Sequence, residues 1–246
     1  MEDRGGEYTD IPLLVRWTTD YDCNNKTAWW YVIKDTPFDI ASLKAKRRYE
    51  INKGKKNFEV RRINPSEYIE DLLRVEILAI SSWPEKYRPY IEKERFKKDV
   101  LKWDRAIVYG GFDKETNELC GYAYLYEYPH HLEFSMLRVN PGSETKGINA
   151  AIVAGILEDH NDRLSKEFYV NDGARSIRHE TAFQDYLEKY FGFRKVYCKL
   201  HIVYRFPVSI AVKFLYPFRK KIKNNGKIGS LVCSVLKMEE FKRACQ

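Results

Sequence analysis

The sequence has no apolar stretch approaching 18 residues, so it predicts no membrane-spanning helix. Its first ten residues, MEDRGGEYTD, are acidic and polar, and they lack the basic start and apolar stretch of a secretory signal. Cysteines are few, and no two of the five have the C-x-x-C spacing of a metal or redox site. We therefore expect reduced thiols in a cytoplasmic protein, with neither a zinc site nor a catalytic cysteine.

The chain also has no internal repeat and no low-complexity linker. Apolar residues make up 44% and charged residues 32% of the 246, so a packed core is expected. The net charge of +8 is unevenly placed: residues 44–62 hold nine Lys/Arg and two Glu, and residues 213–227 hold six Lys/Arg and no acid. This excess indicates an anionic partner, such as a phosphate-bearing cofactor, RNA or a lipid surface.

Hydrophobic periodicity predicts most of the elements. Residues 28–33 have the pattern of a buried strand, and a helix follows with Asp39 or Ser42 as its cap and Gly54 as its end. From 57 to 205 the pattern predicts a strand, two helices, three strands, a helix, a strand, a helix and a strand. The predicted domains are an N-terminal appendage with a strand and a basic helix (1–56), a core (57–205) and a basic tail with a short amphipathic helix (206–246).

Two helices of the core have faces that predict how they pack. The helix that follows Ser66, its expected N-cap, has an apolar face that is interrupted by Glu76. The helix over 148–160 is small on one side, which lets it lie close to a sheet. Its small residues are Ala150, Ala151, Ala154 and Gly155.

The core resembles the GNAT superfamily of N-acyltransferases in the order of its elements and in four stretches. These are FEVRRINPSEYIEDLLRV for the opening strand and helix, GYAYLYEYPHHLEFSMLRV for the central antiparallel pair, VNPGSETKGINAAI for the turn that holds coenzyme A, and YLEKYFGFRK for the closing helix and Gly-Phe turn. The resemblance implies an α/β (α+β) fold with a mixed, mainly antiparallel central sheet flanked by helices. It also implies acetyl-coenzyme A or another acyl-coenzyme A as co-substrate.

The resemblance places coenzyme A at the turn into the helix that starts near 147. Backbone N–H groups at a helix N-terminus can bind a diphosphate. The turn departs from the family pattern, because Glu144 stands where Gln or Arg is usual and Asn149 where Gly or Ala is usual. The residues assigned to coenzyme A by this resemblance are Leu137, Val139, Lys146, Gly147, Ile148, Asn149 and Thr181.

In the family, two central strands separate and the thioester lies between them, which here would be near residues 137–139 and 169–171. A carboxyl group in an aromatic cleft has a raised pKa and suits a general base. In their hairpin, Glu127 and Glu133 could equally face solvent, and Asp172-Gly173 also forms an ordinary turn. The candidate catalytic residues are Glu127, Glu133, His179 and Tyr186. The candidate acceptor-binding residues of the polar loop 171–181 are Asn171, Asp172, Arg175 and Arg178.

Three functions stay open on the sequence. The first is an N-acyltransferase in which the amine of a small acceptor, such as an amino sugar or amino acid, directly attacks acyl-coenzyme A. The second rests on residues 29–60, which are similar to Fem-type aminoacyl transferases and so imply aminoacyl-tRNA as donor. The third is a non-catalytic GNAT-like module that binds an anionic polymer or, weakly, a membrane surface through its basic segments.

Overall fold

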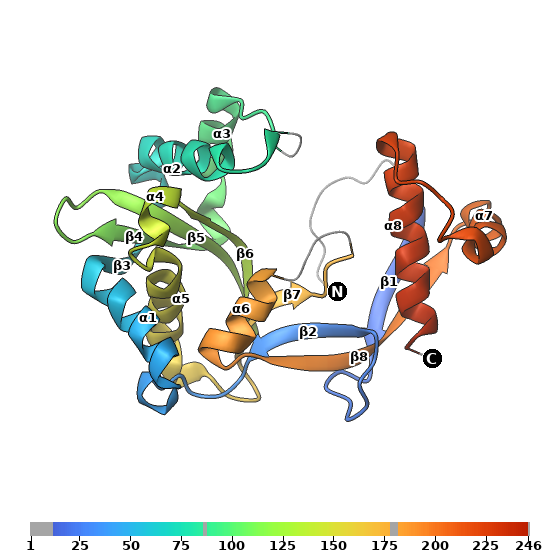
Figure 1. Ribbon diagram of the computed structural model, residues 1–246, viewed down its shortest axis with the longest axis horizontal. Helices are drawn as coiled ribbons and strands as arrows, with labels where there is room; N and C mark the ends of the chain where they lie inside the picture. Colours follow the sequence, from blue (N-terminus) through green and yellow to red (C-terminus); the bar gives the residue numbers. More distant parts are fainter. Residues whose placement is uncertain (1–11, 86–87, 178–181, 246) are drawn as a thin grey trace. The chain divides into compact units, whose positions relative to one another are not determined.

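The structure, a computed structural model, describes residues 12–85, 88–177 and 182–245 (Figure 1). Its strands are β1 (Leu14–Thr19), β2 (Trp29–Lys34), β3 (Phe58–Ile63), β4 (Ala106–Asp113), β5 (Leu119–Tyr128), β6 (His131–Val139), β7 (Tyr169–Ala174) and β8 (Arg194–Tyr204). Its helices are α1 (Ala45–Asn57), α2 (Ile69–Ser81), α3 (Lys93–Val100), α4 (Pro141–Glu144), α5 (Ile148–Asp159), α6 (Ala182–Phe191), α7 (Val208–Leu215) and α8 (Gly226–Arg243). None of the described helices combines the length and the apolar content needed to cross a bilayer.

The elements between 57 and 205 follow the predicted order, with α4 as an additional short helix before α5. Eight strands are hydrogen-bonded in the order β1-β8-β2-β7-β6-β5-β4-β3. The pairs β1–β8, β3–β4, β4–β5 and β5–β6 are antiparallel, whereas β6–β7 is parallel. The predicted fold class, a mixed and mainly antiparallel sheet flanked by helices, is confirmed.

The chain divides into two compact units, which are described separately. The larger unit contains residues 32–173 and 182–194. The smaller unit contains the described residues within 1–31, 174–181 and 195–246. The domain limits proposed from the sequence stay a prediction.

Strands β4 and β5 of the larger unit carry helices on opposite faces, because alternate residues of a strand point to opposite sides. Phe112 of β4 and Tyr122 of β5 pack in one cluster with the apolar face of α2. The preceding residues, Gly111 and Gly121, face the other way, and a Cβ at either would lie 2.8–3.0 Å from the nearest side-chain atoms, with Ile152 of α5 at 3.0 Å in both cases. Glycine on these strands therefore lets α5 lie directly on the sheet.

Small residues also set the position of α5 against its other neighbours, as its sequence predicts. A Cβ at Gly155 would lie 2.7 Å from Val60 of β3. A Cβ at Gly54 of α1 would overlap the carbonyl oxygen of Gly147, the N-cap of α5. Gly147 has a φ of +89°, a left-handed conformation that favours glycine. Helices α1 and α5 consequently lie side by side in close contact (Figure 1).

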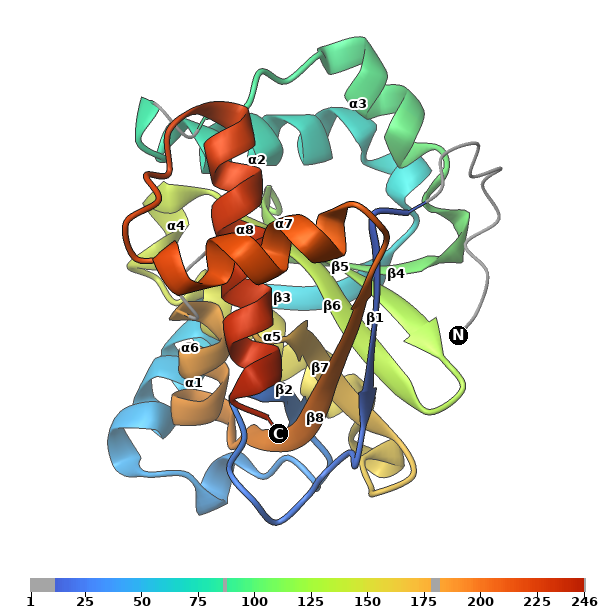
Figure 2. The ribbon, with the colours of Figure 1, turned by 90° about the vertical axis from the view of Figure 1, so that its right-hand side faces the viewer.

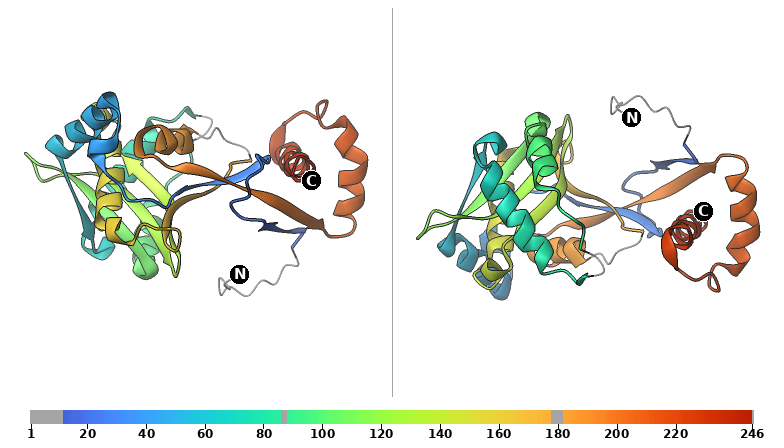
Figure 3. Two further views of the ribbon diagram at one scale, coloured as in Figure 1. Left: turned by 90° about the horizontal axis from the view of Figure 1, so that it is seen from below. Right: turned by 90° about the horizontal axis from the view of Figure 1, so that it is seen from above.

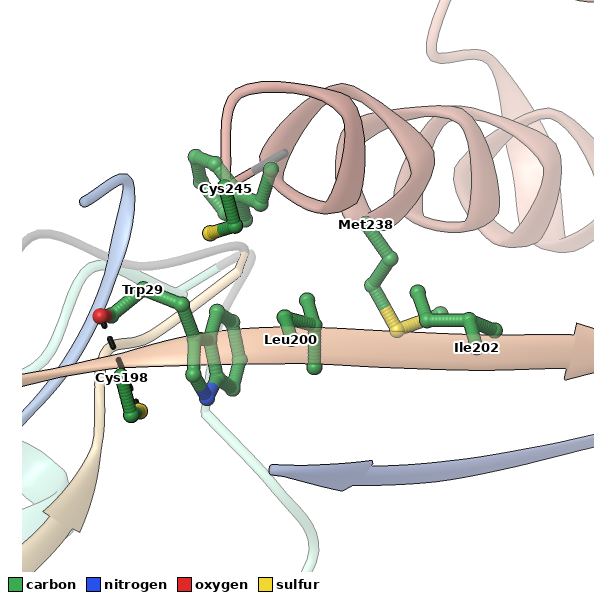
Figure 4. Packing of buried hydrophobic residues seen from close by; sticks show 7 residues of the cluster. Trp29, Cys198, Leu200, Ile202, Met238 and Cys245 are labelled. Atoms are coloured by element: carbon green, nitrogen blue, oxygen red, sulfur yellow. Dashed lines mark hydrogen bonds between the residues drawn. The ribbon is translucent and has the colours of Figure 1, made fainter. Parts of the chain in front are cut away.

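The smaller unit has a hydrophobic core of its own, formed mainly by β8 and α8. Trp29, Leu200, Ile202 and Met238 are buried together in this core (Figure 4). The thiol of Cys198 donates to the carbonyl oxygen of Trp29 at 3.8 Å, so it behaves as a buried structural group. Helices α7 and α8 lie side by side in this unit (Figures 2 and 3).

Several details of the sequence prediction are wrong. Gly54 does not end its helix, because it is a buried packing residue and α1 continues to Asn57. Ser66 does not cap α2: Asn64 accepts from the Ser66 N–H at 3.3 Å and begins a short turn, and α2 starts at Ile69. The expected loop 171–181 begins as strand, since β7 extends to Ala174. Strand β1 and helix α7 are not predicted from the sequence.

Substitution of Gly54 by Ala tests the close contact between α1 and α5. The added Cβ meets backbone rather than a movable side chain, so we expect a loss of about 1–3 kcal/mol in the free energy of unfolding. The matched control is Gly142→Ala in α4, where the nearest atom would be 3.4 Å away and the effect should be below about 0.5 kcal/mol. Urea unfolding followed by circular dichroism measures both. Equal stability of the two variants would contradict the contact.

Candidate active site

Strands β6 and β7 of the larger unit pair over only a short distance. The register joins His131 to Tyr169, Leu132 to Val170 and Glu133 to Asn171, and no later pair is formed between the described residues of these strands. On its other edge, β6 has an irregularity at Ser135, where Phe134 and Met136 face consecutive residues of β5. The two strands therefore separate beyond Glu133 and Asn171. Residues 137–139 lie in the separated part, as expected, whereas residues 169–171, also expected there, are the ones that pair with β6.

A cleft of about 370 Å³ lies beside this separation. Residues from α2, β6, α4, α5, β7 and α6 contribute to its wall, so all of it belongs to the larger unit. Four residues predicted from the sequence line it: Leu137, Val139, Asn149 and Asp172. The other lining residues include Ser82, Trp83, Phe134, Ser135, Met136, Arg138, Glu144 and Phe183.

Asp172 is an acid of the cleft whose pKa differs clearly from its ordinary value. It is half-buried, and burial raises the pKa of its carboxyl group to about 7. A hydrogen bond from Gln184 acts in the opposite direction, and the negative charge of Glu133 raises the pKa further. A carboxyl group that titrates near neutral pH can accept a proton from an ammonium or hydroxyl group.

The turn around Asp172 is held by amide side chains. Asn171 is buried, and its Oδ1 accepts from the Gly173 N–H at 2.7 Å. Gln184 of α6 donates Nε2–H to the backbone oxygens of Asp172 at 3.3 Å and of Gly173 at 3.4 Å. Gly173 has a φ of +78° with no atom near its Cβ position. These contacts fix the backbone that carries the carboxylate, so Asn171 is a positioning residue in this structure.

Arg138 of β6 brings a positive charge to the same cleft. Its Nε lies 3.1 Å from Oε2 of Glu76, a residue of α2 that is only 6% exposed. Tyr122 donates its hydroxyl to the same carboxylate at 2.7 Å, and the Arg138 guanidinium lies 5.3 Å from the centre of the Trp83 ring. Glu76 thus holds Arg138 in one orientation at the cleft wall.

The N-terminus of α5 offers backbone N–H groups to an anion such as a diphosphate, but few positively charged side chains to neutralise it. The first turn of a helix leaves its N–H groups without helical partners, and here the ladder begins with Ala151 N–H to the Gly147 oxygen at 3.0 Å. Ile148 is fully buried, so only its backbone can reach a ligand. Lys146 forms an ion pair with Asp113 at 3.1 Å and does not line the cleft, whereas Glu144 does.

The remaining predicted site residues lie elsewhere or make other contacts. Glu127 forms an ion pair with Arg163 at 2.6 Å and is not part of the cleft lining. Tyr186 packs among Phe183, Tyr190 and Phe191, and burial raises its pKa well above the usual range. Arg175, in the smaller unit, donates to the Ala28 carbonyl oxygen at 2.9 Å. Arg178, His179 and Thr181 fall outside the residues that the structure describes.

Arg138 lies within the range 137–139 expected at the strand separation, but the sequence predicts no role for it and does not place Glu76 in the site. One signal for Glu76 is nevertheless present. Glu76 interrupts the apolar face of its helix, and a carboxylate at such a position needs a buried cationic or hydrogen-bonding partner. Arg138 and Tyr122 are those partners. No signal in the sequence identifies which cation of the chain reaches Glu76, because α2 and β6 are 50 or more residues apart.

Replacement of Arg138 by Met tests the buried pair. Without the guanidinium, the Glu76 carboxylate is left buried with only the Tyr122 hydroxyl, so we expect a loss of about 3 kcal/mol in the free energy of unfolding. The double variant Glu76→Gln/Arg138→Met removes both charges and should recover most of that loss. Urea titration of the two variants measures the difference. No recovery in the double variant would show that the pair is not the cause.

Asp172 predicts a pH dependence of stability. Its carboxyl group ionises near pH 4 in the unfolded chain and near pH 7 in the folded one, so folding becomes less favourable as the pH rises through that window and then stays constant. Asp172→Asn should therefore be more stable than wild type at pH 8, by about 2 kcal/mol, because a shift of this size corresponds to at most about 4 kcal/mol and solvent screens a half-buried group. At pH 4 the two should unfold alike. Equal stability at pH 8 in thermal or urea unfolding would contradict the raised pKa.

Comparisons with known proteins agree on the fold. No protein-family model matches the chain, and no curated protein matches it in sequence. Among solved structures, L-PGS from Bacillus licheniformis is 15% identical with a TM-score of 0.50 and covers 85% of this chain and 67% of its own. A C-terminal domain (DUF2156) described as that of a lysylphosphatidylglycerol synthetase from Agrobacterium fabrum is 10% identical with a TM-score of 0.50, covering 82% of this chain and 65% of its own.

A weaker similarity, with a TM-score of 0.40 and 15% identity, is to a GCN5-related N-acetyltransferase-like protein from Streptococcus suis, with 78% of this chain and 63% of that chain covered. The chain spans about two thirds of the length of each of these structures. At such identities the likeness concerns the fold alone. The similarities to L-PGS and to the Agrobacterium domain show that the chain shares their fold. The strand order and the separation of β6 from β7 agree with the GNAT-like sheet expected from the sequence.

Proposed function

We propose that this chain is an acyltransferase that moves an acyl group to a nucleophilic acceptor in the cleft between β6 and β7. The observation that carries the proposal is the Asp172 carboxyl group, which has a pKa of about 7 and lines the cleft beside the point where the strands separate. At neutral pH about half of such groups are ionised, so Asp172 can accept a proton from an acceptor amine or hydroxyl.

The proposed reaction is a direct attack without a covalent enzyme intermediate. Asp172 takes a proton from the acceptor, and the freed electron pair attacks the carbonyl carbon of the donor. The carbonyl oxygen then carries a negative charge, which the fixed guanidinium of Arg138 attracts. When the oxyanion collapses, the bond to the leaving group breaks. The leaving group departs with the bonding electron pair and takes up the proton that Asp172 holds, which restores the carboxylate. The cleft contributes chiefly by holding the two reactants at the right distance.

The charges of the cleft favour an aminoacyl group as the transferred acyl group. Glu144 lines the cleft, and a donor with a free α-ammonium group would complement its carboxylate. The name of the Agrobacterium domain refers to lysylphosphatidylglycerol, which is an aminoacyl product. This donor class corresponds to the second function drawn from the sequence, with aminoacyl-tRNA as donor.

Acyl-coenzyme A is the second candidate donor, and one observation favours it. The Gly147 turn leaves the first amide groups of α5 free of helical partners beside the cleft, as a diphosphate requires. The surrounding side chains do not complement that diphosphate, because the Lys146 ammonium pairs with Asp113 and Glu144 adds a negative charge. A small-molecule amine would be the acceptor in this case.

Ligand-induced shifts in melting temperature distinguish the two donors. A non-hydrolysable aminoacyl-tRNA analogue at tenfold its dissociation constant should raise the melting temperature of the wild-type chain, and acetyl-coenzyme A should not. Glu144→Gln removes a carboxylate from the cleft and should weaken the aminoacyl ligand while improving any binding of coenzyme A. A clear shift with acetyl-coenzyme A alone would make acyl-coenzyme A the donor.

The role of Asp172 predicts a pH profile for the reaction. With a donor established by the melting experiments, kcat/KM should rise tenfold per pH unit below about pH 7 and level off above it, because the ionised carboxylate is the active form. Asp172→Asn should lower kcat at least 100-fold at pH 8 with little change in KM. The control is Glu127→Gln, which removes an acid outside the cleft and should leave the rate unchanged. A fully active Asp172→Asn variant would refute the proposed base.

A further inference from the structure

The segment of the smaller unit from Arg205 to Met238 has an unusual charge pattern. It contains eight Lys/Arg and no Asp or Glu over 34 residues. It begins just before α7 and ends within α8. A positive segment of this length attracts an anionic surface and repels a second copy of itself.

Most cations of this segment form no ion pair within the part of the chain that the structure describes. Five of them are exposed and form no ion pair with any described residue: Arg205, Lys213, Lys220, Lys221 and Lys223. The nearby acids of α8 are already engaged, since Glu239 pairs with Arg243 and Lys242, and Glu240 pairs with Lys237 and Arg219. The five charges are therefore available to an external anion.

The same segment exposes large apolar side chains. Of sixteen exposed large hydrophobic residues in the described part of the chain, eight lie between 203 and 231. Phe206, Phe214 and Phe218 are 72%, 71% and 57% exposed. Ile210 and Phe214 are four residues apart in α7 and so share one side of the helix, and Phe206 lies in the segment just before it. Exposed phenylalanines that alternate with lysines are typical of a surface that lies on a membrane.

Helix α7 is apolar on its inner side as well. Val208, Ala211, Val212 and Leu215 line a cavity of about 500 Å³ whose other walls come from α8, the start of β1 and residues 176–177. The only hydroxyl-bearing residues of the lining are Ser176 and Ser234, so the cavity is almost wholly apolar. Apart from Ser209 and Lys213, all residues of α7 are apolar, yet the helix lies at the surface of its unit (Figures 2 and 3).

The cavity is continuous with the exposed apolar surface. Leu215 and Leu231 line the cavity and are also 36% and 49% exposed. An apolar chain that lies along α7 can therefore enter the cavity without crossing a polar barrier. A volume of this size is within the range of sites that hold small-molecule ligands.

We infer that the smaller unit binds the surface of an anionic phospholipid bilayer, with α7 lying in the headgroup region and one lipid acyl chain in the cavity. The five unpaired cations contact phosphate groups, and Phe206, Ile210, Phe214 and Phe218 enter the boundary between headgroups and acyl chains. Nucleic acid would use the cations but not an apolar cavity. Membrane binding by this unit does not depend on catalysis in the cleft of the larger one.

Vesicle co-sedimentation of the full chain tests the inference. Vesicles with 50% phosphatidylglycerol should bind the chain at least tenfold more tightly than vesicles of phosphatidylcholine alone. Raising NaCl from 50 to 500 mM should weaken that binding, because exposed charges are screened. Equal binding to both vesicles, or no binding to either, would overturn the proposal. So would self-association of the vesicle-free chain that is lost in Phe206→Ser/Phe214→Ser, because the apolar face would then belong to a second copy.

Three variants at exposed residues test whether vesicle binding depends on this segment or only on the positive charge of the chain. Phe206→Ser/Phe214→Ser and Lys220→Glu/Lys221→Glu should each reduce vesicle binding at least tenfold. The control Lys46→Glu/Lys56→Glu makes the same change in net charge at two exposed lysines of α1 and should bind normally. Loss of vesicle binding in the α1 variant, together with normal binding in the other two variants, would show that the membrane-binding surface lies outside the segment from Arg205 to Met238. Circular dichroism confirms that each variant is folded.

The cavity has its own test, with a short-chain phosphatidylglycerol kept below its micellar concentration. Calorimetry should show one saturable site in the wild-type chain. Ala211→Trp fills the cavity from its exposed side and should abolish this site, whereas Phe214→Ser should leave it nearly unchanged. Binding that persists in Ala211→Trp would show that the acyl chain does not occupy the cavity.

Discussion

The short parallel pairing between β6 and β7 is the constraint on which the candidate site depends. Three residue pairs join the strands, and both continue beyond the last pair without further hydrogen bonds to each other. A fully paired β7 would occupy the space beside Leu137 and Val139. Because the pairing stops at Glu133, Asp172 and Arg138 come to line one cleft. The glycines that let α5 lie directly on the sheet bring Asn149, in its first turn, to the same cleft.

Burial of the polar groups around this opening costs free energy of folding, and close packing does not account for their presence. Glu76 is buried in the apolar face of α2, with Arg138 and Tyr122 as its partners. A buried ion pair of this kind is often no more stabilising than apolar residues of similar size. Asp172 likewise lies where burial opposes its ionisation. Groups held in such positions are common where a protein binds or transforms a ligand, which agrees with the proposed acyl transfer.

The sequence predicts the order of elements well because periodicity and turn residues are local. Phe58, Val60 and Arg62 alternate along a strand. Gly155, on the small side of the 148–160 helix, contacts Val60 of the sheet, whereas Ile148 and Ile152 make the contacts with Gly111 and Gly121. Contacts between residues far apart in the sequence leave no such local pattern. Gly54 has the pattern of a helix end, yet it is a contact residue because Gly147, more than 90 positions later, lies against it. The raised pKa of Asp172 and the pairing of Glu76 with Arg138 likewise depend on the folded arrangement.

The central claim is that a carboxyl group beside the separated strands is poised to accept a proton at neutral pH. A ¹³C NMR titration of the Asp172 side-chain carboxyl carbon in the folded chain measures this property directly, with Asp172→Asn to assign the resonance. The proposed role of Asp172 requires a midpoint near pH 7. A midpoint near pH 4, the ordinary value for aspartate, would contradict it.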